Sequence, residues 1–503
     1  MLALISRLVL RYHRWLGLLA ALPVMVWGLS GLSHPILTRL QPQPAAMTPP
    51  AQLLTVTNEQ RAQLPALSVL LQPLGISELQ EARLLSWQSR AVWQLKLPGQ
   101  EQRVYVDALH GQRLNELDKE IAVLLARHYA GEKAREISHV ELITAFTPEY
   151  LYINRLLPVW RVEFAGGDHL RAYVETSPLR LATLDNDGKA LFGKVFSNLH
   201  SWAFIPHEGL RDVLMSAFLL LAFSASVGGL WLYGFFWRKP QTGERASMPR
   251  RWHRRLGVLA ALSTMTFTGS ATLHLLLLDK GSNDLPPQRF AAPAIAVSTL
   301  TASPAILSLP AGSVLQLLSL PAGPVWRVAP GSMAMVGKTA DKGLPQGEHA
   351  HHHGGVSASA ADSGEQYFSA LDGQPLADGP QAHARILAMA FSGMPEAEIT
   401  DVQRVSHFEG EYGFINKRLP VWKVAFATPE HLAVFVETST GIKAAEVHDI
   451  QRFEGTSFAY LHKGVWLDGL GKNIRDLLLG FFALLNVLVV ALGLSVWWRR
   501  RRA

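Results

Sequence analysis

Four long apolar segments dominate the hydrophobic pattern of the chain. They cover about residues 15–37, 213–237, 256–278 and 477–498. A helix needs about 20 mostly apolar residues to cross the hydrocarbon core of a bilayer, so each segment predicts a transmembrane helix. The first segment is long for the apolar region of a secretory signal and lacks a clear small-residue cleavage site, so we expect a retained anchor.

Two long stretches between these segments show a shorter period. Apolar and polar residues alternate in VWQLKL (92–97), RVYVDA (103–108), VWRVEF (159–164) and RAYVET (171–176), which is typical of half-buried strands. The segment AVLLARHYAG (122–131) predicts a helix between two such pairs of strands. These stretches therefore predict α+β domains outside the membrane.

Basic residues set the expected orientation. They precede the first span at Arg7, Arg11 and Arg14, fill the short connection between the second and third spans, and follow the fourth span as Arg499–Arg502. Cytoplasmic segments carry such an excess of Lys and Arg, so the two long stretches should be external. The predicted order is a first span with a cytoplasmic N-terminus (1–40), an external domain (41–210), a second span (211–238), a basic loop (239–255), a third span (256–279), a second external domain (280–475) and a fourth span with a basic tail (476–503).

The chain also repeats itself. RYHRWLGLLAAL (11–22) aligns with RWHRRLGVLAAL (251–262) at an offset of 240 residues, and YINRLLPVWRVEF (152–164) aligns with FINKRLPVWKVAF (414–426) at an offset of 262. Both halves run in the same direction through the membrane, so we expect parallel repeats related by a pseudo-twofold axis along the membrane normal. The predicted fold class is a four-helix transmembrane bundle built from two tandem repeats, each with an α+β external domain.

Composition narrows the chemistry. The 503 residues include 19 His and no Cys, which excludes disulfides, thiolate metal sites and covalently attached c-type haem. The net charge of +7 comes largely from arginines beside the spans, which indicates membrane orientation and not nucleic-acid binding. A metal or redox centre would have to use His, Met, Tyr or carboxylate side chains.

Six histidines recur in pairs at the ends of the spans. His13 pairs with His253 and His34 with His274 at the 240 offset, and His200 pairs with His462 at the 262 offset. Each 21-residue separation on one helix corresponds to ~31 Å and to a ~60° difference in direction, so both imidazoles can face the bundle interior. His13 and His253 should lie at the cytoplasmic face, and the other four at the external face.

Imidazole is a ligand for haem iron, and bis-His ligation of b-type haem needs one His from each of two facing helices. The four external histidines could ligate two haems, and His13 with His253 could hold a third, which would form an electron path across the bilayer. The pairing of His34 with His200, His274 or His462 stays open. The alternative is that these residues are solvated or hydrogen-bonded interfacial histidines, with His13 part of a basic collar.

Several short motifs of the chain resemble those of the PepSY-associated transmembrane family. The motifs are the span opening H-R-x-L-G, an L-H pair ahead of a span, and the external strand VYVDALHG (104–111); they occur here as YHRWLG, WHRRLG, NLHSW and YLHKG. The resemblance implies PepSY-like external domains in the periplasm, a bacterial inner membrane, b haem held by the span-end histidines, and reduction of ferric siderophores or ferric iron. YFSALDG (367–373) departs from the motif because Ser369 stands where the first half has Asp107.

The favoured hypothesis is therefore a haem-dependent ferric reductase of an inner membrane, with membrane quinol or a partner reductase as donor, since the cytoplasmic segments are too short for a dinucleotide-binding unit. A membrane-anchored PepSY peptide-binding module and a metal permease accessory are the alternatives; spans without Asp or Glu argue against a cation path. The insertion 331–365 holds a His-rich run that either captures a transition metal or is a solvated loop: His349, His351, His352 and His353.

Overall fold

The computed structural model describes residues 2–235, 247–277, 286–307, 310, 313–330 and 364–502. The predicted metal ligands His349, His351, His352 and His353 lie outside these described residues. The chain divides into two compact units. The membrane unit comprises Met1–Gln41, Gly188–Lys280 and Ile450–Ala503, and the sheet unit comprises Pro42–Asp187 and Gly281–Asp449.

Four helices of the membrane unit are long and apolar enough to span a bilayer. They are α1 (Leu2–Leu37), α6 (Glu208–Phe235), α7 (Met248–Leu277) and α10 (Lys472–Arg502). Each is longer than its apolar segment because polar turns extend it at one or both ends. The finding supports the predicted multi-pass membrane protein.

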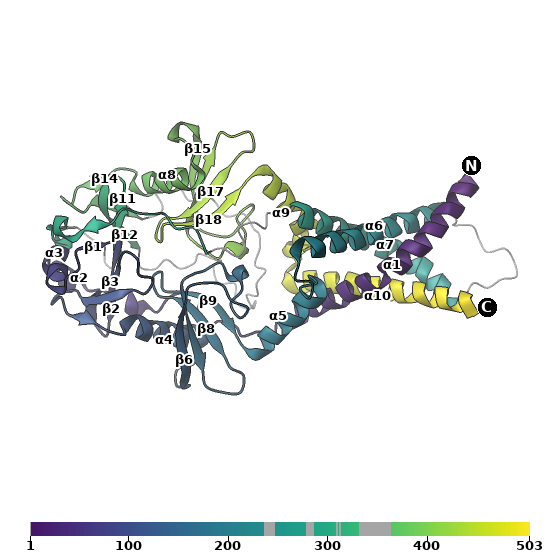
Figure 1. The fold of residues 1–503 in the computed structure, drawn as a ribbon, viewed down its shortest axis with the longest axis horizontal. Coiled ribbons are helices and arrows are strands. Elements are labelled where there is room, and N and C mark those ends of the chain that lie inside the picture. Colours follow the sequence, from purple (N-terminus) through teal and green to yellow (C-terminus); the bar gives the residue numbers. More distant parts are fainter. Residues whose placement is uncertain are drawn as a thin grey trace. The chain divides into compact units, whose positions relative to one another are not determined.

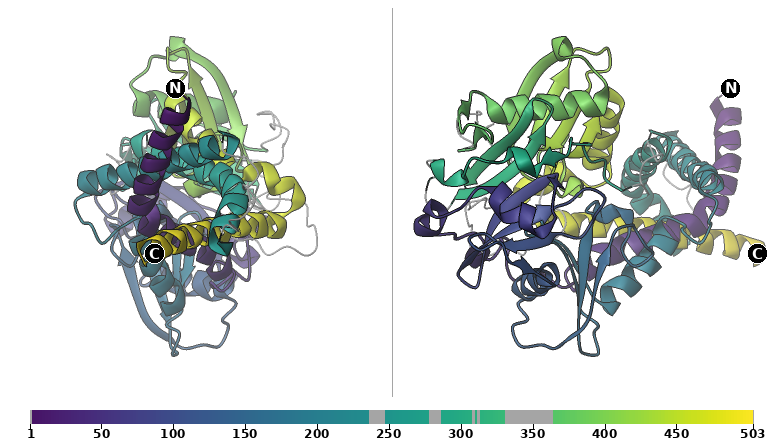
Figure 2. Two further views of the ribbon diagram at one scale, coloured as in Figure 1. Left: turned by 90° about the vertical axis from the view of Figure 1, so that its right-hand side faces the viewer. Right: turned by 60° about the vertical axis from the view of Figure 1, so that its left-hand side comes forward.

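The four helices form a closed ring. α1 and α7 each pack against α6 and α10, so α1 and α7 occupy opposite positions. Figures 1 and 2 show the N- and C-termini at the same end of this bundle. At that end, the guanidinium groups of Arg501 and Arg502 lie 4.4 Å and 4.6 Å from the ring centroids of Trp497 and Trp498, a cation–π arrangement suited to the interface of a bilayer.

Two shorter helices belong largely to the membrane unit. α5 (Asp187–His200) precedes α6, and α9 (Asp449–Leu461) precedes α10 through a 3₁₀ turn at Val465–Leu470. Both helices leave the bundle obliquely at the end opposite the termini (Figure 1). They were not predicted as separate elements, because each is too short and too polar on one side to resemble a span.

An eight-stranded antiparallel sheet forms the centre of the sheet unit. Its order is β14-β13-β12-β11-β2-β3-β4-β5, so strands from both halves of the chain form one continuous sheet. The two sets meet where β11 pairs with β2, with Leu317 opposite Ala82. The strands are β2 (Glu81–Trp87), β3 (Arg90–Lys96), β4 (Val104–Asp107), β5 (Arg113–Leu114), β11 (Ser313–Leu320), β12 (Gly323–Pro330), β13 (Gln366–Ser369) and β14 (Pro375–Leu376).

Two four-stranded antiparallel sheets complete the unit, one from each half, in the orders β6-β7-β8-β9 and β15-β16-β17-β18. Their helices, α4 (Leu117–Ala130) and α8 (Gly379–Ser392), both end at a glycine of positive φ, Gly131 and Gly393. The strands are β6 (Ile137–Ile143), β7 (Val159–Phe164), β8 (Arg171–Glu175), β9 (Arg180–Asp185), β15 (Ile399–Val405), β16 (Val421–Phe426), β17 (Ala433–Glu437) and β18 (Ile442–Val447).

Several short elements complete the sheet unit. Large aromatic side chains lie in its cores. The small elements are α2 (Asn58–Ala62), α3 (Leu67–Leu71) and the paired strands β1 (Glu78–Leu79) and β10 (Ile295–Ala296). Trp160 and Trp422, which lie at equivalent positions of the two repeats, are both buried core residues.

Candidate functional site

Two imidazole rings meet inside the bundle near the end that carries the termini. His13 of α1 and His253 of α7 come from opposite helices of the ring, and their ring centroids lie 6.3 Å apart at an interplanar angle of 51°. The sequence predicted that these two residues lie at one face of the membrane. The structure brings them together as a pair.

The neighbouring helices hold the two rings in equivalent ways. The Nδ1 atom of His13 lies 2.8 Å from the carbonyl oxygen of Ala225 in α6, and that of His253 lies 3.0 Å from the carbonyl oxygen of Val489 in α10. A carbonyl can only accept, so Nδ1 carries the proton and Nε2 keeps its lone pair. This arrangement is the usual one for a metal-binding histidine.

One glycine lies against each of these rings. A Cβ atom added to Gly229 of α6 would lie 3.3 Å from Cε1 of His13, and one added to Gly493 of α10 would lie 3.1 Å from Cε1 of His253. Each glycine follows the accepting carbonyl by four residues, that is, by about one helical turn. Both helices thus leave room for an imidazole that lies close to their backbone.

A second pair of rings lies at the other end of the bundle. The centroids of His200, the last residue of α5, and His462, which directly follows α9, are 6.4 Å apart at an interplanar angle of 78°. The Nδ1 atom of His200 lies 2.9 Å from Oγ of Ser30, and that of His462 lies 3.3 Å from Oγ of Ser270. Burial lowers the pKa of His200 to about 4 and that of His462 to about 3, so both rings are neutral near pH 7.

Phenyl rings flank this second pair on both sides. Phe196 stacks on His200 with a centroid distance of 4.7 Å and also lies 5.2 Å from His34. Phe458 stacks on His462 at 4.5 Å and on His274 at 4.3 Å. The structure therefore places each phenyl ring in contact with both histidines of its own half.

The surroundings of His34 and His274 differ. Nδ1 of His274 lies 2.5 Å from a carboxylate oxygen of Glu454, which accepts a hydrogen bond from it. The position equivalent to Glu454 in the first half is Phe192, whose ring centroid lies 6.4 Å from that of His34. A carboxylate therefore contacts His274 in the second half, whereas an aromatic ring packs against His34 in the first half.

The distance between the two rings of each pair is the one expected for a metal ion held between two imidazoles. Metal–nitrogen bonds of about 2 Å on both sides place the ring centroids roughly 6 Å apart, which both pairs match. Among the described residues, no three His, Asp or Glu side chains converge on one point. Two imidazole nitrogens are too few for zinc, which takes four ligands, but would suit the iron of a haem. In donor type and centroid distance, the residues fit a bis-His haem.

Sequence reasoning missed the residues that hold the histidines. Their repetition was available as a signal: Ser30 and Ser270 share the offset of the first spans, and Phe196 and Phe458 share that of the later segments. Small and aromatic residues are common in membrane helices, so identity at one offset did not stand out.

Other recurrent histidines have structural partners in the sheet unit. Nδ1 of His169 lies 2.6 Å from Asp187, and Nδ1 of His431 lies 2.7 Å from Asp449. Both interactions join the start of a strand to the first residue of a following helix, which indicates a structural role. Nε2 of His128, which has no repeat partner, lies 2.8 Å from the carbonyl oxygen of Thr48.

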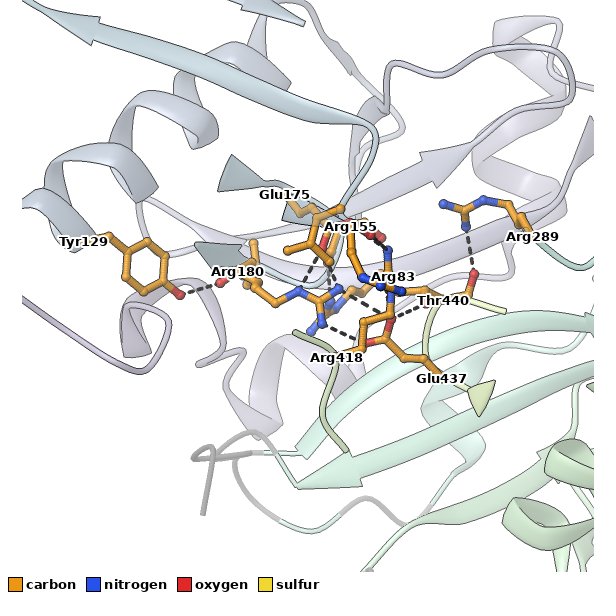
Figure 3. A network of polar contacts seen from close by, with 12 residues as sticks. Arg83, Tyr129, Arg155, Glu175, Arg180, Arg289, Arg418, Glu437 and Thr440 are labelled. Atoms are coloured by element: carbon orange, nitrogen blue, oxygen red, sulfur yellow. Dashed lines mark hydrogen bonds and ion pairs between the residues drawn. The ribbon is translucent and has the colours of Figure 1, made fainter. Parts of the chain in front are cut away.

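A buried network of charges joins the two four-stranded sheets of the sheet unit (Figure 3). Arg180 donates to Glu175 of its own half at 2.8 Å and to Glu437 of the other half at 2.9 Å. Arg418 donates to Glu437 at 2.7 Å. Glu175 and Glu437, which recur at the 262 offset, therefore have a structural role as acceptors in this network.

The pocket beside this network is small. Its lining includes Arg103, Asp118, Glu175, Arg289 and Thr440, and its volume is about 20 Å³. A cavity of that volume holds about one water molecule. The network therefore fits a joint between the two halves of the unit better than a substrate pocket.

A family model described as the PepSY-associated TM region matches residues 10–408, which include five of the six paired histidines. The comparison with curated proteins found no match.

Proposed function

This chain belongs to the PepSY-associated transmembrane family, and from that premise we propose that it is a b-haem electron-transfer protein that reduces ferric iron or ferric siderophores. The observation that carries the proposal is the pair of imidazole pairs, with centroids 6.3 Å and 6.4 Å apart at the two ends of one four-helix bundle. His13 and His253 would hold one haem, and His200 and His462 another.

The two tandem repeats support this assignment. Each proposed site takes one histidine from each repeat, as expected if the repeats surround a pseudo-twofold axis along the membrane normal. The sequence analysis allowed two haems among the four histidines at this end of the bundle; beside the haem of His200 and His462, a second one here would need His34 and His274, which lie against the phenyl rings that flank the pair. The haem content of a variant that lacks both residues decides whether a third haem binds.

Backbone groups and apolar helices of the bundle would set the proton position and the surroundings of the histidines before haem binds. The carbonyl oxygens of Ala225 and Val489 fix the proton on Nδ1 of His13 and His253, so Nε2 is free to bind iron. Buried apolar helices exclude water and lower the local dielectric around the site. Bound haem supplies one-electron chemistry, which the described side chains do not provide by themselves.

The proposed substrate is an iron(III) complex with hard oxygen donors. One electron converts iron(III) into iron(II), which such donors hold less strongly because they prefer the harder and more highly charged ion. The electron donor would be membrane quinol or a partner reductase. Because arginines gather at the end of the bundle with the termini, we expect that end to face the cytoplasm of a bacterial inner membrane, and the sheet unit would then be periplasmic.

Haem content and reactivity test the proposal. Protein produced with an adequate haem supply and purified in detergent should show b-type bands in a dithionite-reduced minus oxidised spectrum, with one haem for each pair of imidazoles. The reduced protein should then be reoxidised by a ferric siderophore, with iron(II) trapped by a coloured chelator. A colourless preparation would contradict the haem assignment, and a reduced haem that is inert toward ferric complexes would contradict the substrate.

Substitution of Gly229 by valine tests the site at the end with the termini. The new side chain would enter the space of the His13 ring, because even a Cβ atom there lies 3.3 Å from Cε1. We expect Gly229→Val to lose the haem held by His13 and His253. Gly234→Val on the same helix is the matched control, since a Cβ atom at Gly234 meets nothing within 4 Å. Equal haem content in the two variants would refute the assignment.

A further inference from the structure

Two exposed apolar stripes run along α5 and α9 on the sides that do not carry the paired histidines. In α5 the stripe consists of Leu191, Val195 and Leu199, and the side chain of Leu191 is 64% exposed. Residues four apart are rotated by about 40° from one another, so the three lie within an arc of ~80°. They form one continuous face.

The helix has two further faces. Phe192, Phe196 and His200 form the adjacent one, which contacts His34 and the bundle. Lys194 is exposed on the remaining polar side. One apolar face of α5 therefore packs in the bundle, and the other apolar face is exposed.

A similar stripe occurs in α9. Phe453 and Leu461 stand at the positions equivalent to Leu191 and Leu199, and both are exposed, with Phe453 55% exposed. Ser457 replaces Val195 between them, and the exposed Ile450 lies on the same side of the helix. Tyr460 extends this stripe. Because exposed apolar residues recur at two equivalent positions of the two helices, an accidental exposed side chain is a poor explanation.

The stripes continue into the surface that the spans present to lipid. After α5, the exposed apolar residues include Phe204 and then Val213 in the first turns of α6; after α9, they include Trp466, 67% exposed, and then Leu477 in α10. Aromatic residues between an amphipathic helix and a span are typical of the membrane interface. An apolar face opposite a basic or polar one is typical of helices that lie in the headgroup region.

We infer that α5 and α9 lie in the interface of the bilayer, with their exposed stripes among the acyl chains near the lipid headgroups. The lipid-contacting surface of the protein then extends beyond the four spans. It includes both helices that deliver His200 and His462, so that pair of imidazoles would lie at headgroup depth. This inference does not depend on haem binding.

Single-cysteine labelling tests the inference directly, because the chain contains no cysteine of its own. Val195→Cys and Phe453→Cys would be labelled with an environment-sensitive fluorophore in the full-length protein, reconstituted in nanodiscs. Ala190→Cys and Gly455→Cys, at exposed positions on other sides of the same helices, are the matched controls. Leu220→Cys, exposed in the middle of α6, reports contact with deep lipid.

Nitroxide-labelled phospholipids then act as quenchers. We expect both stripe probes to be quenched several-fold more strongly than their controls, and more strongly by a nitroxide near the headgroup than by one near the end of the acyl chain. The Leu220→Cys probe should show the opposite depth preference. A water-soluble quencher should reach the control probes and not the stripe probes.

Two outcomes would overturn the inference. If the aqueous quencher reaches Val195→Cys as readily as Ala190→Cys, the stripe faces water. If neither quencher reaches the stripe probes, protein covers the stripe, either another part of this chain or a second copy. Stripe probes in lipid combined with a haem-free bundle would leave the inference standing and remove only the proposed redox function.

Discussion

Replacement of His462 by alanine is expected to remove the haem held at the His200–His462 site and to abolish the reduction of ferric complexes. His200 and His462 would together hold this haem, so loss of the His462 imidazole would remove half of its protein ligands. Haem content, measured with the spectrum of the reduced protein, should fall by one haem per chain. The haem of the other pair should remain.

The matched control for His462→Ala is His431→Ala. His431 is also a histidine of the second half, but it is exposed and pairs with Asp449 in the sheet unit. Its loss should leave the haem content unchanged. Should both variants keep the full complement of haem, the assigned pair is wrong. Should His462→Ala lose all haem together with its fold, the circular dichroism of the purified protein would reveal it, and Ser270→Ala would serve as the milder test.

Loss of a charge from the buried network is expected to destabilise the sheet unit by about 3–5 kcal/mol, the usual cost of breaking a buried ion pair. Glu437 is 2% exposed and contacts both Arg180 and Arg418. Glu437→Gln would leave two guanidinium groups facing a neutral amide. The midpoint of denaturant unfolding, followed by the fluorescence of the buried tryptophans, measures the change.

The control for this substitution is Glu446→Gln. Glu446 pairs with Lys443 at 2.7 Å on the exposed side of β18. Surface pairs of this kind contribute about 0–1 kcal/mol, so the midpoint should barely move. Similar losses in both variants would mean that the buried network carries no special share of the stability.

Acid should reproduce the effect of Glu437→Gln. Burial by itself would raise the pKa of Glu437, but the charges of Arg180 and Arg418 outweigh burial and lower it to about 2 from 4.5. Because the folded-state pKa is the lower one, this stabilisation is complete above about pH 4.5 and is lost as the pH falls toward 2. Glu437→Gln should show a weaker dependence of unfolding on pH in that range.

The spans were predictable because their signal is local. A run of about 20 consecutive apolar residues matches the thickness of a bilayer, so it predicts a span without knowledge of any other segment. The repeat then placed His13 and His253 at the same depth. The strands of the sheet unit were predictable for the same reason, since alternation in VWRVEF (159–164) requires only neighbouring residues. β7 covers that segment as expected.

Features that depend on distant pairing were not predictable. β11 is buried along its whole length, and nothing in SVLQLLSL says that its neighbour will be β2, more than 200 residues earlier. The pairing of His200 with His462 was open for a related reason. That pairing depends on the positions of the two short helices α5 and α9. The helical periodicity of α1 and α7 predicts only the directions of His34 and His274.

The seam between β2 and β11 has a consequence for any attempt to divide the protein. If the chain were cut between α6 and α7 and one fragment produced alone, β2 or β11 would expose a row of unpaired amide and carbonyl groups. Such an edge recruits other strands and favours aggregation. Co-produced fragments could instead reassemble, because the missing neighbour of each edge is the other fragment. Main-chain hydrogen bonding across the seam, more than the covalent connection, would then make the two fragments a single molecule.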